Sequence, residues 1–316
     1  MKKLWFPLTV LSLFLLCILR PAQAVAGAAA GLSLWYCTVL PTLLPCMVLS
    51  GYLISSSLIC RLPSGPLALV TGWFCGYPMG AKTVADLWKS GRVSGQEGRR
   101  LLRLCCMPSP MFLTGFLCTG MLRLSLPESL PYLAALYLPP VLCFLPGRRR
   151  GGSGRQGEDS LNAASVDMSS VAGERRDGAS AAAPPSSEAG PLQTFLNFEK
   201  AMMDGFLIMA KIGGYLMFFT MLSYFFRSWI RNPFLSSLVP GLLEMTSGIA
   251  FTVQTGLPGA VTTALCFAFA AFGGLSGLTQ TMSVLKSTPF SGRSYVFWKL
   301  LQAVLTFAAV WMLCPK

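Results

Sequence analysis

Long apolar stretches without a single Asp, Glu, Lys or Arg constrain this chain more than any other feature. A helix needs about 20 consecutive apolar residues to cross the hydrocarbon core of a bilayer. Backbone groups cannot stay unpaired in lipid, and no stretch alternates between polar and apolar residues, so we expect helices rather than a β-barrel. The sequence therefore predicts an all-α, polytopic integral membrane protein. The uncharged stretches are residues 21–60, 62–81, 104–122, 129–147, 245–285 and 300–315.

The N-terminus fits two interpretations. Lys2 and Lys3 precede an apolar stretch at residues 4–19 and then Ala-Gln-Ala at residues 22–24, which is the order of a cleavable secretory signal. The same stretch fits an uncleaved first span. We prefer the uncleaved span, because the second half of the chain also begins with an apolar span, at residues 205–226.

Positive charge is placed as it is in membrane proteins. The formal net charge is +13, and basic residues such as Arg99, Arg100, Arg103 and those at 148–150 flank apolar stretches. That placement follows the positive-inside rule, whereas a nucleic-acid-binding domain interleaves basic and aromatic residues. We therefore expect the lipid bilayer, and no nucleic acid, as a partner.

Few side chains could carry enzyme chemistry. The chain has no histidine, which removes the usual general base and the usual zinc ligand. Its eleven cysteines form no CxxC pair, so we expect most of them to be buried as small hydrophobes. We expect no enzyme, no catalytic residue, no metal site and no organic cofactor.

A polar segment divides the chain. Residues 147–190 are rich in Gly, Ser, Ala, Pro and mixed charge and contain almost no large apolar residue, so they cannot bury a core. We expect a disordered cytoplasmic linker there. It would separate a first membrane half, residues 1–146, from a second membrane half, residues 191–316.

The two halves match at a fixed offset of 197 positions. Ser50-Gly51 then falls on Ser247-Gly248, and Gly76 falls on Gly273. Repeated halves with Gly-interrupted apolar segments are typical of secondary transporters. The positive-inside rule favours re-entrant hairpins at residues 67–81 and 259–280, whereas full crossings would make the repeats inverted.

The segment from Gly72 to Thr83 contains three glycines and Pro78 within nine residues. Gly costs about 1 kcal/mol and Pro about 3 kcal/mol in a helix interior, so this segment cannot be a continuous helix. The backbone groups that the break frees must meet protein, water or a ligand, and the N-terminus of a half-helix favours an anion. Lys82 would add positive charge. Alternatively, the glycines only pack helices together and Lys82 extends to the interface.

The second half offers polar groups at the matching break and one acidic side chain. Residues 272–281 contain glycines, hydroxyls and the Gln280 amide in place of Tyr77, Pro78 and Lys82. Glu244 is the only acidic residue after Asp204, and an ionisable group within an apolar span is a candidate functional residue. It could bind a coupling H+ or Na+, or it could pair with Lys82 or Lys286.

Three motifs in order resemble a known family. They are GYPMGAKTVADLWKSGRVS, PGLLEMTSGI and FGGLSGLTQTMSVLKST. They resemble the YlbJ-type sporulation integral membrane proteins, also called stage V sporulation protein V, which are built from nucleoside-recognition or Gate domains. The resemblance covers about residues 34–305 without the linker. The sequence departs from the family pattern at Met107-Pro108-Ser109-Pro110, where a polar pair such as Asn-Ser is expected.

The resemblance implies export of dipicolinic acid across the outer forespore membrane of an endospore-forming bacterium. We therefore expect a transporter of a small organic anion, in that membrane or in the cell membrane. The alternatives are a structural or assembly protein of the spore envelope and a permease for a nucleoside-like solute. The residues expected to bind substrate are Gly76, Tyr77, Pro78, Gly80, Lys82, Glu244, Thr246, Ser247, Gly273, Gly274, Ser276 and Gln280.

Overall fold

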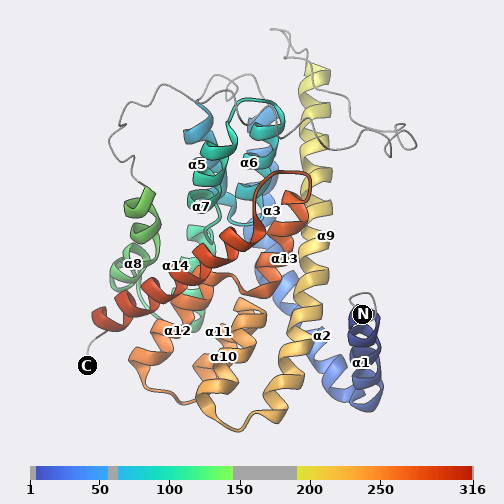
Figure 1. Ribbon diagram of the computed structural model, residues 1–316, viewed down its shortest axis with the longest axis vertical. Coiled ribbons are helices and arrows are strands. Elements are labelled where there is room, and N and C mark those ends of the chain that lie inside the picture. The colour runs from blue at the N-terminus through green and yellow to red at the C-terminus, as the bar shows by residue number, and fades with distance from the viewer. Residues whose placement is uncertain (1–4, 56–62, 145–190, 315–316) are drawn as a thin grey trace.

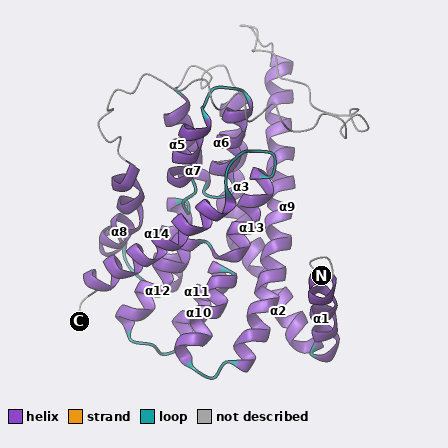
Figure 2. Cartoon of the chain, viewed as in Figure 1, coloured by secondary structure: helices purple, strands orange, loops and turns teal. Residues whose placement is uncertain are grey.

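The computed structural model describes residues 5–55, 63–144 and 191–314, and every regular element in them is a helix (Figure 2). Large apolar side chains such as Leu207, Val304 and Met312 are exposed, on outer faces that lipid would cover. The prediction of an all-α, polytopic membrane protein is confirmed. Four helices of this described part are long and apolar enough to cross a membrane: Pro21–Leu49, Gln193–Trp229, Gly259–Leu285 and Gly292–Leu313.

The N-terminal helices lie on the outside of the molecule. After α1 (Trp5–Leu19), α2 (Pro21–Leu34), a π-helical turn η1 (Trp35–Val39) and α3 (Leu40–Ser55) follow one another directly. Both α2 and α3 pack along α9 (Pro191–Trp229), the long helix at the right of Figure 1. Gly27 and Gly31 permit the close approach, because a Cβ on either would lie 2.7 Å from a backbone Cα of α9.

The Gly-Pro segment of the first half forms a hairpin of two short helices. Helix α5 (Ser64–Cys75) ends at Gly76, which has a φ of 69°, and α6 (Met79–Lys89) returns alongside α5. The two arms meet at glycines: a Cβ on Gly80 would lie 3.0 Å from the Cα of Gly72. A helical hairpin is therefore present where the sequence predicts one, and its re-entrant placement in the membrane stays a prediction.

A second hairpin lies in the other half. Helix α10 (Pro233–Leu243) ends at Glu244, and α11 (Met245–Gln254) packs back against α10. Its arms also meet at glycines, since a Cβ on Gly248 would collide with the Cα of Gly241. In Figure 1 the α5–α6 hairpin opens toward the upper end of the molecule and the α10–α11 hairpin opens toward the lower end.

Each hairpin is followed by a broken helix and then by an unbroken one. In the first half, α7 (Gly95–Cys105) is separated from the π-helix η2 (Phe112–Met121) by residues 106–111, and α8 (Leu126–Phe144) follows. In the second half, α12 (Gly259–Phe272) is separated from α13 (Gly274–Leu285) by Gly273, and α14 (Gly292–Leu313) follows.

This order corrects the pairing made at an offset of 197. The counterpart of the first hairpin is the α10–α11 hairpin, so Gly76 matches the Glu244 turn rather than Gly273. Residues 259–280 do not form a re-entrant hairpin: α12 packs chiefly on α14 and α11, whereas α13 packs on α6, α9 and α10. Together they form one interrupted span, Gly259–Leu285. The hairpins open toward opposite ends, which is the inverted arrangement left open by the sequence.

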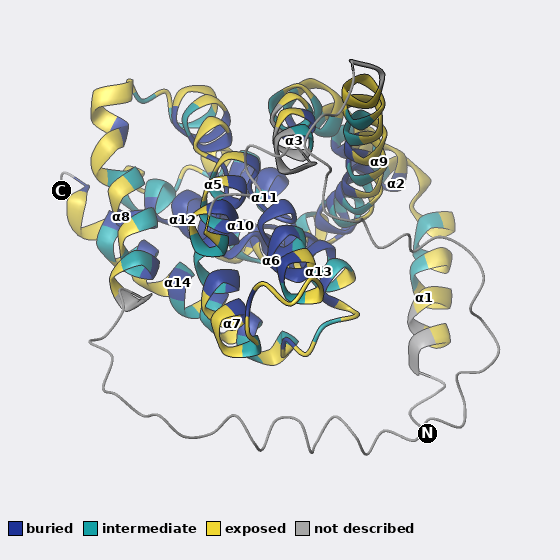
Figure 3. Ribbon diagram, turned by 90° about the horizontal axis from the view of Figure 1, so that it is seen from above, coloured by how far each residue is buried: buried dark blue, intermediate teal, exposed yellow. Residues whose placement is uncertain are grey.

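The interrupted span forms the centre of the fold. In the view from above, buried residues gather on α10, α11, α12 and α6, and exposed residues lie on the outer helices (Figure 3). About 78% of the Gly259–Leu285 window is buried, against 22% for Gly292–Leu313. The predicted linker, residues 147–190, lies outside the described residues, and the division into two membrane halves stays a prediction.

Candidate functional site

The tips of the two hairpins meet at a small cavity of about 50 Å³, here called the inner cavity. A buried water needs roughly 10–15 Å³, so the space can hold a few waters or an ion. Both hairpin tips, both broken helices and α9 contribute to its wall. The predicted residues that line it are Gly76, Tyr77, Glu244, Thr246, Gly273, Ser276 and Gln280.

Glu244 caps the second arm of the α10–α11 hairpin. Its backbone is extended, and its carboxylate accepts a hydrogen bond of 2.7 Å from the N–H of Ser247 and another from the hydroxyl of Thr246. A carboxylate at this position satisfies donors that the first turn of a helix leaves unpaired. Glu244 is 2% exposed and makes no ion pair with any described residue. The alternative in which it pairs with Lys82 or Lys286 is therefore absent from the structure.

Tyr77 joins the first hairpin to the break at Gly273. Its hydroxyl lies 3.2 Å from the carbonyl O of Ala270, one of the carbonyls left unpaired at the end of α12, and 2.8 Å from the Sδ of Met245. The ring packs over Gly273, which has a φ of 84°. One side chain therefore contacts the second hairpin and the broken helix of the second half.

Gln280 stands between the inner cavity and a larger, more open one. Its Nε2 donates a 3.1 Å hydrogen bond to the Oγ of Ser276, and its side chain lines both spaces. The larger space, here called the vestibule, is about 800 Å³ and lies between α6, α9 and α13. Ile212 also lines both, so the two spaces are adjacent.

The vestibule is basic. Lys82, Lys89 and Lys211 line it together with Asp86, which gives a balance of three positive charges and one negative charge. The Nζ of Lys82 lies 3.5 Å from a carboxylate oxygen of Asp86, and both side chains are partly exposed. Pro78 also lines the vestibule. The structure thus places Lys82 on the vestibule and not on the inner cavity.

Three predicted residues line neither space and instead shape the backbone. Gly80 packs on the carbonyl of Cys105 and Gly274 on the carbonyl of Leu243, where a Cβ would be too close. Ser247 contributes its N–H to the Glu244 cap. What any of the twelve residues binds stays a prediction.

Sequence reasoning missed part of the wall. Pro108 and Ser109, in the break between α7 and η2, line the inner cavity. Two prolines within an otherwise apolar stretch were the signal for that break. Lys299 was missed as well: it is 3% exposed and lies in α14, where a lysine among apolar residues was the available signal.

These features define a polytopic helical membrane protein whose opposed hairpins and broken helices line one small cavity. The sporulation integral membrane protein YlbJ of Bacillus subtilis (strain 168) is 30% identical to this chain over 118 residues. The match covers 33% of this chain and 29% of that protein, so the chain spans less than a third of its relative. No protein-family profile matches the chain, and no solved structure matches it. The likeness supports the resemblance to the YlbJ-type proteins over that portion of the chain.

Proposed function

We propose that this protein is a membrane transporter of a small organic anion. The proposal rests chiefly on one arrangement: two hairpin tips close an inner cavity beside a vestibule that carries three lysines. Broken helices expose backbone groups in the middle of a membrane protein only where they line a cavity or contact protein. Breaks from both halves of the chain contribute to this one cavity.

The substrate proposed is dipicolinate, an aromatic dicarboxylate. The resemblance suggests it, and the printed name of the Bacillus subtilis relative, a sporulation integral membrane protein, agrees with a role in spore formation. The outer forespore membrane is the proposed location. The two carboxylates of dipicolinate suit the lysine-lined vestibule, because a concave site lined by one sign of charge concentrates ions of the opposite sign.

The inner cavity is too small for such a solute in this conformation. About 50 Å³ accommodates a few waters, whereas the adjacent vestibule of about 800 Å³ accommodates an aromatic ring with its substituents. We therefore infer a closed conformation, in which at least one hairpin must move to admit substrate. The coupling ion, H+ or Na+, would bind at Glu244.

Uptake of radiolabelled dipicolinate into proteoliposomes tests the proposal. Purified protein should give saturable uptake above empty liposomes, and Lys82→Ala should reduce it. Lys286→Ala is the matched control, because Lys286 is exposed and lines neither space. A purified, folded protein without dipicolinate uptake under any imposed gradient would contradict the proposal. Uptake of a nucleoside instead would favour the permease, and no solute uptake would favour a structural role.

A further inference from the structure

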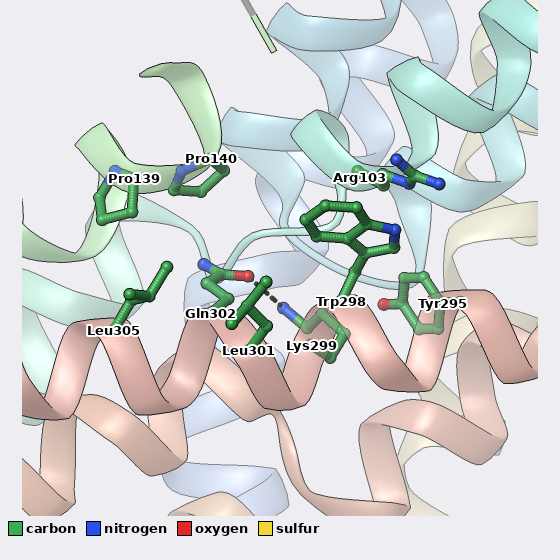
Figure 4. A pocket seen from close by; sticks show the side chains of 9 residues that line it. All are labelled: Arg103, Pro139, Pro140, Tyr295, Trp298, Lys299, Leu301, Gln302 and Leu305. Carbon is green, nitrogen blue, oxygen red and sulfur yellow. Dashed lines mark hydrogen bonds between the residues drawn. The ribbon is translucent and has the colours of Figure 1, made fainter. Parts of the chain in front are cut away.

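Lys299 carries a positive charge into the interior of the protein, where it lines a pocket separate from the inner cavity and lies behind Tyr77. Its Nζ donates hydrogen bonds to the carbonyl O of Cys106 at 2.9 Å and to the Oε1 of Gln302 at 3.3 Å. Figure 4 shows the Lys299 and Gln302 side chains pointing toward each other from the same helix, α14. No described acidic side chain forms an ion pair with Lys299.

One role of Lys299 is to hold the break that follows α7. Cys106 is the C-terminal cap of α7, so its carbonyl has no partner within the helix. The neighbouring Gln302 directs its Nε2 to the Sδ of Met107 at 2.9 Å. These contacts explain why polar groups are buried here. A neutral donor could replace the ammonium in them, so they do not account for the charge.

The charge acts on the inner cavity through Tyr77. The Nζ of Lys299 lies 5.3 Å from the centroid of the Tyr77 ring, and Tyr77 lines the inner cavity. An aromatic face attracts an ammonium group, and this attraction holds the Lys299 ammonium near the Tyr77 ring. A charge is screened less in a protein interior than in water, so the Lys299 charge acts on groups at the inner cavity.

Glu244, like Tyr77, lines the inner cavity, and it is buried as Lys299 is. With its carboxylate ionised, the two fixed charges cancel, because −1 and +1 sum to zero. With a cation bound at Glu244, the site keeps a net charge of +1 from Lys299. An anion is then attracted to a cavity that would otherwise be neutral.

We propose that Lys299 is a specificity-determining residue for the inner cavity, and that its positive charge, placed behind the Tyr77 ring, selects anionic ligands. This inference rests on the proposed function for the site but concerns binding rather than transport. Lys299 holds the break after α7 through its hydrogen bond to Cys106, and its charge attracts the ligand. Removing its charge should weaken binding of a carboxylate ligand while binding of the uncharged analogue changes little.

Equilibrium binding to purified protein tests this directly. The probes are radiolabelled dipicolinate and its uncharged diamide, measured with wild type, Lys299→Gln and Lys299→Arg. Lys299→Gln keeps a hydrogen-bond donor but loses the charge, and Lys299→Arg keeps the charge. We expect the preference for the dicarboxylate over the diamide to fall about tenfold or more in Lys299→Gln and to persist in Lys299→Arg.

Gln302→Leu separates the charge from the structural role. It removes the contact with Met107 and one of the two hydrogen bonds of Lys299 but leaves the ammonium and its bond to Cys106, so the melting temperature should fall while the preference for the dicarboxylate persists. Lys286→Gln is the control for loss of a lysine elsewhere.

An unchanged preference in Lys299→Gln would overturn the inference, and so would a wild type that does not bind the dicarboxylate. Charge-dependent binding in wild type without any uptake into proteoliposomes would uphold the inference and contradict the transport proposal.

Discussion

The ring of Tyr77 occupies the space that Gly273 leaves by having no side chain. A Cβ on Gly273 would lie 3.0 Å from both the Cζ and the hydroxyl oxygen of Tyr77. The two residues are 196 positions apart, and the contact joins the first hairpin to the broken helix of the second half. The wall of the inner cavity therefore depends on the missing side chain of Gly273, which leaves room for the Tyr77 ring.

Gly273→Ala should destabilise the protein. Its φ of 84° suits glycine, and a side chain there costs roughly 1–3 kcal/mol before the contact with Tyr77 is counted. We expect a lower melting temperature in detergent, followed by tryptophan fluorescence. Gly256→Ala is the matched control, because Gly256 has a φ of 67° but open space around it. Equal losses in the two variants would mean that the Tyr77 contact contributes nothing.

Gly248→Ala should disturb the α10–α11 hairpin. Its Cβ would collide with backbone atoms of Gly241, so the arms must separate, at a cost of about 1–3 kcal/mol. Thermal unfolding of the purified protein measures this. In contrast, Gly65→Ala in α5 meets nothing within 4 Å and should leave stability unchanged or slightly raised. A Gly248→Ala protein with wild-type stability would show that the arms are less closely packed than described.

Glu244→Gln should uncouple uptake from an imposed ion gradient. The amide oxygen can still accept from the Ser247 N–H, so we expect a loss of stability of less than about 1 kcal/mol. Binding of a cation, however, requires the carboxylate. The measurement compares uptake with and without an inward Na+ or H+ gradient, with Glu199→Gln, on the exposed start of α9, as control. Full gradient dependence in Glu244→Gln would exclude Glu244 as the coupling site.

Neutralising the vestibule lysines should slow entry of an anion. Replacing Lys82, Lys89 and Lys211 together by Gln removes all three positive charges that line it, and we expect initial uptake to fall roughly tenfold at low ionic strength. The difference should shrink as salt is added, because the Debye length is about 8 Å at 0.15 M. A deficit that does not change with salt would indicate damage to the fold rather than lost attraction.

Some of the site could be predicted because its signals are local. Glycines and a proline in an apolar stretch identify the Gly76 break, and a lone carboxylate identifies Glu244. The pairing of the two halves could not be predicted from identities such as Ser50-Gly51 and Ser247-Gly248. Ser and Gly are common, so chance matches outnumber the matches between true counterparts.

The missed features depend on contacts between distant segments. Glycines in an apolar stretch predict the first hairpin, but that Gly72 meets Gly80 follows only from the packing of its two arms. A lysine among apolar residues is a local signal for Lys299, but its partner, the carbonyl of Cys106, lies 193 positions away in the sequence. The contact that places the charge inside the fold therefore could not be predicted.

The vestibule also has an electrical consequence. If the lysine-lined space of about 800 Å³ opens to the solution on one side of the membrane, the water in it would carry the potential of that solution inward to Gln280 and Ile212. The transmembrane voltage would then fall mainly across the layer formed by the hairpin tips. Moving one elementary charge through that layer is worth about 2.3 kcal/mol per 100 mV. A solute or ion passing between the hairpins would therefore cross most of the field within a few residues, and its passage would register as current.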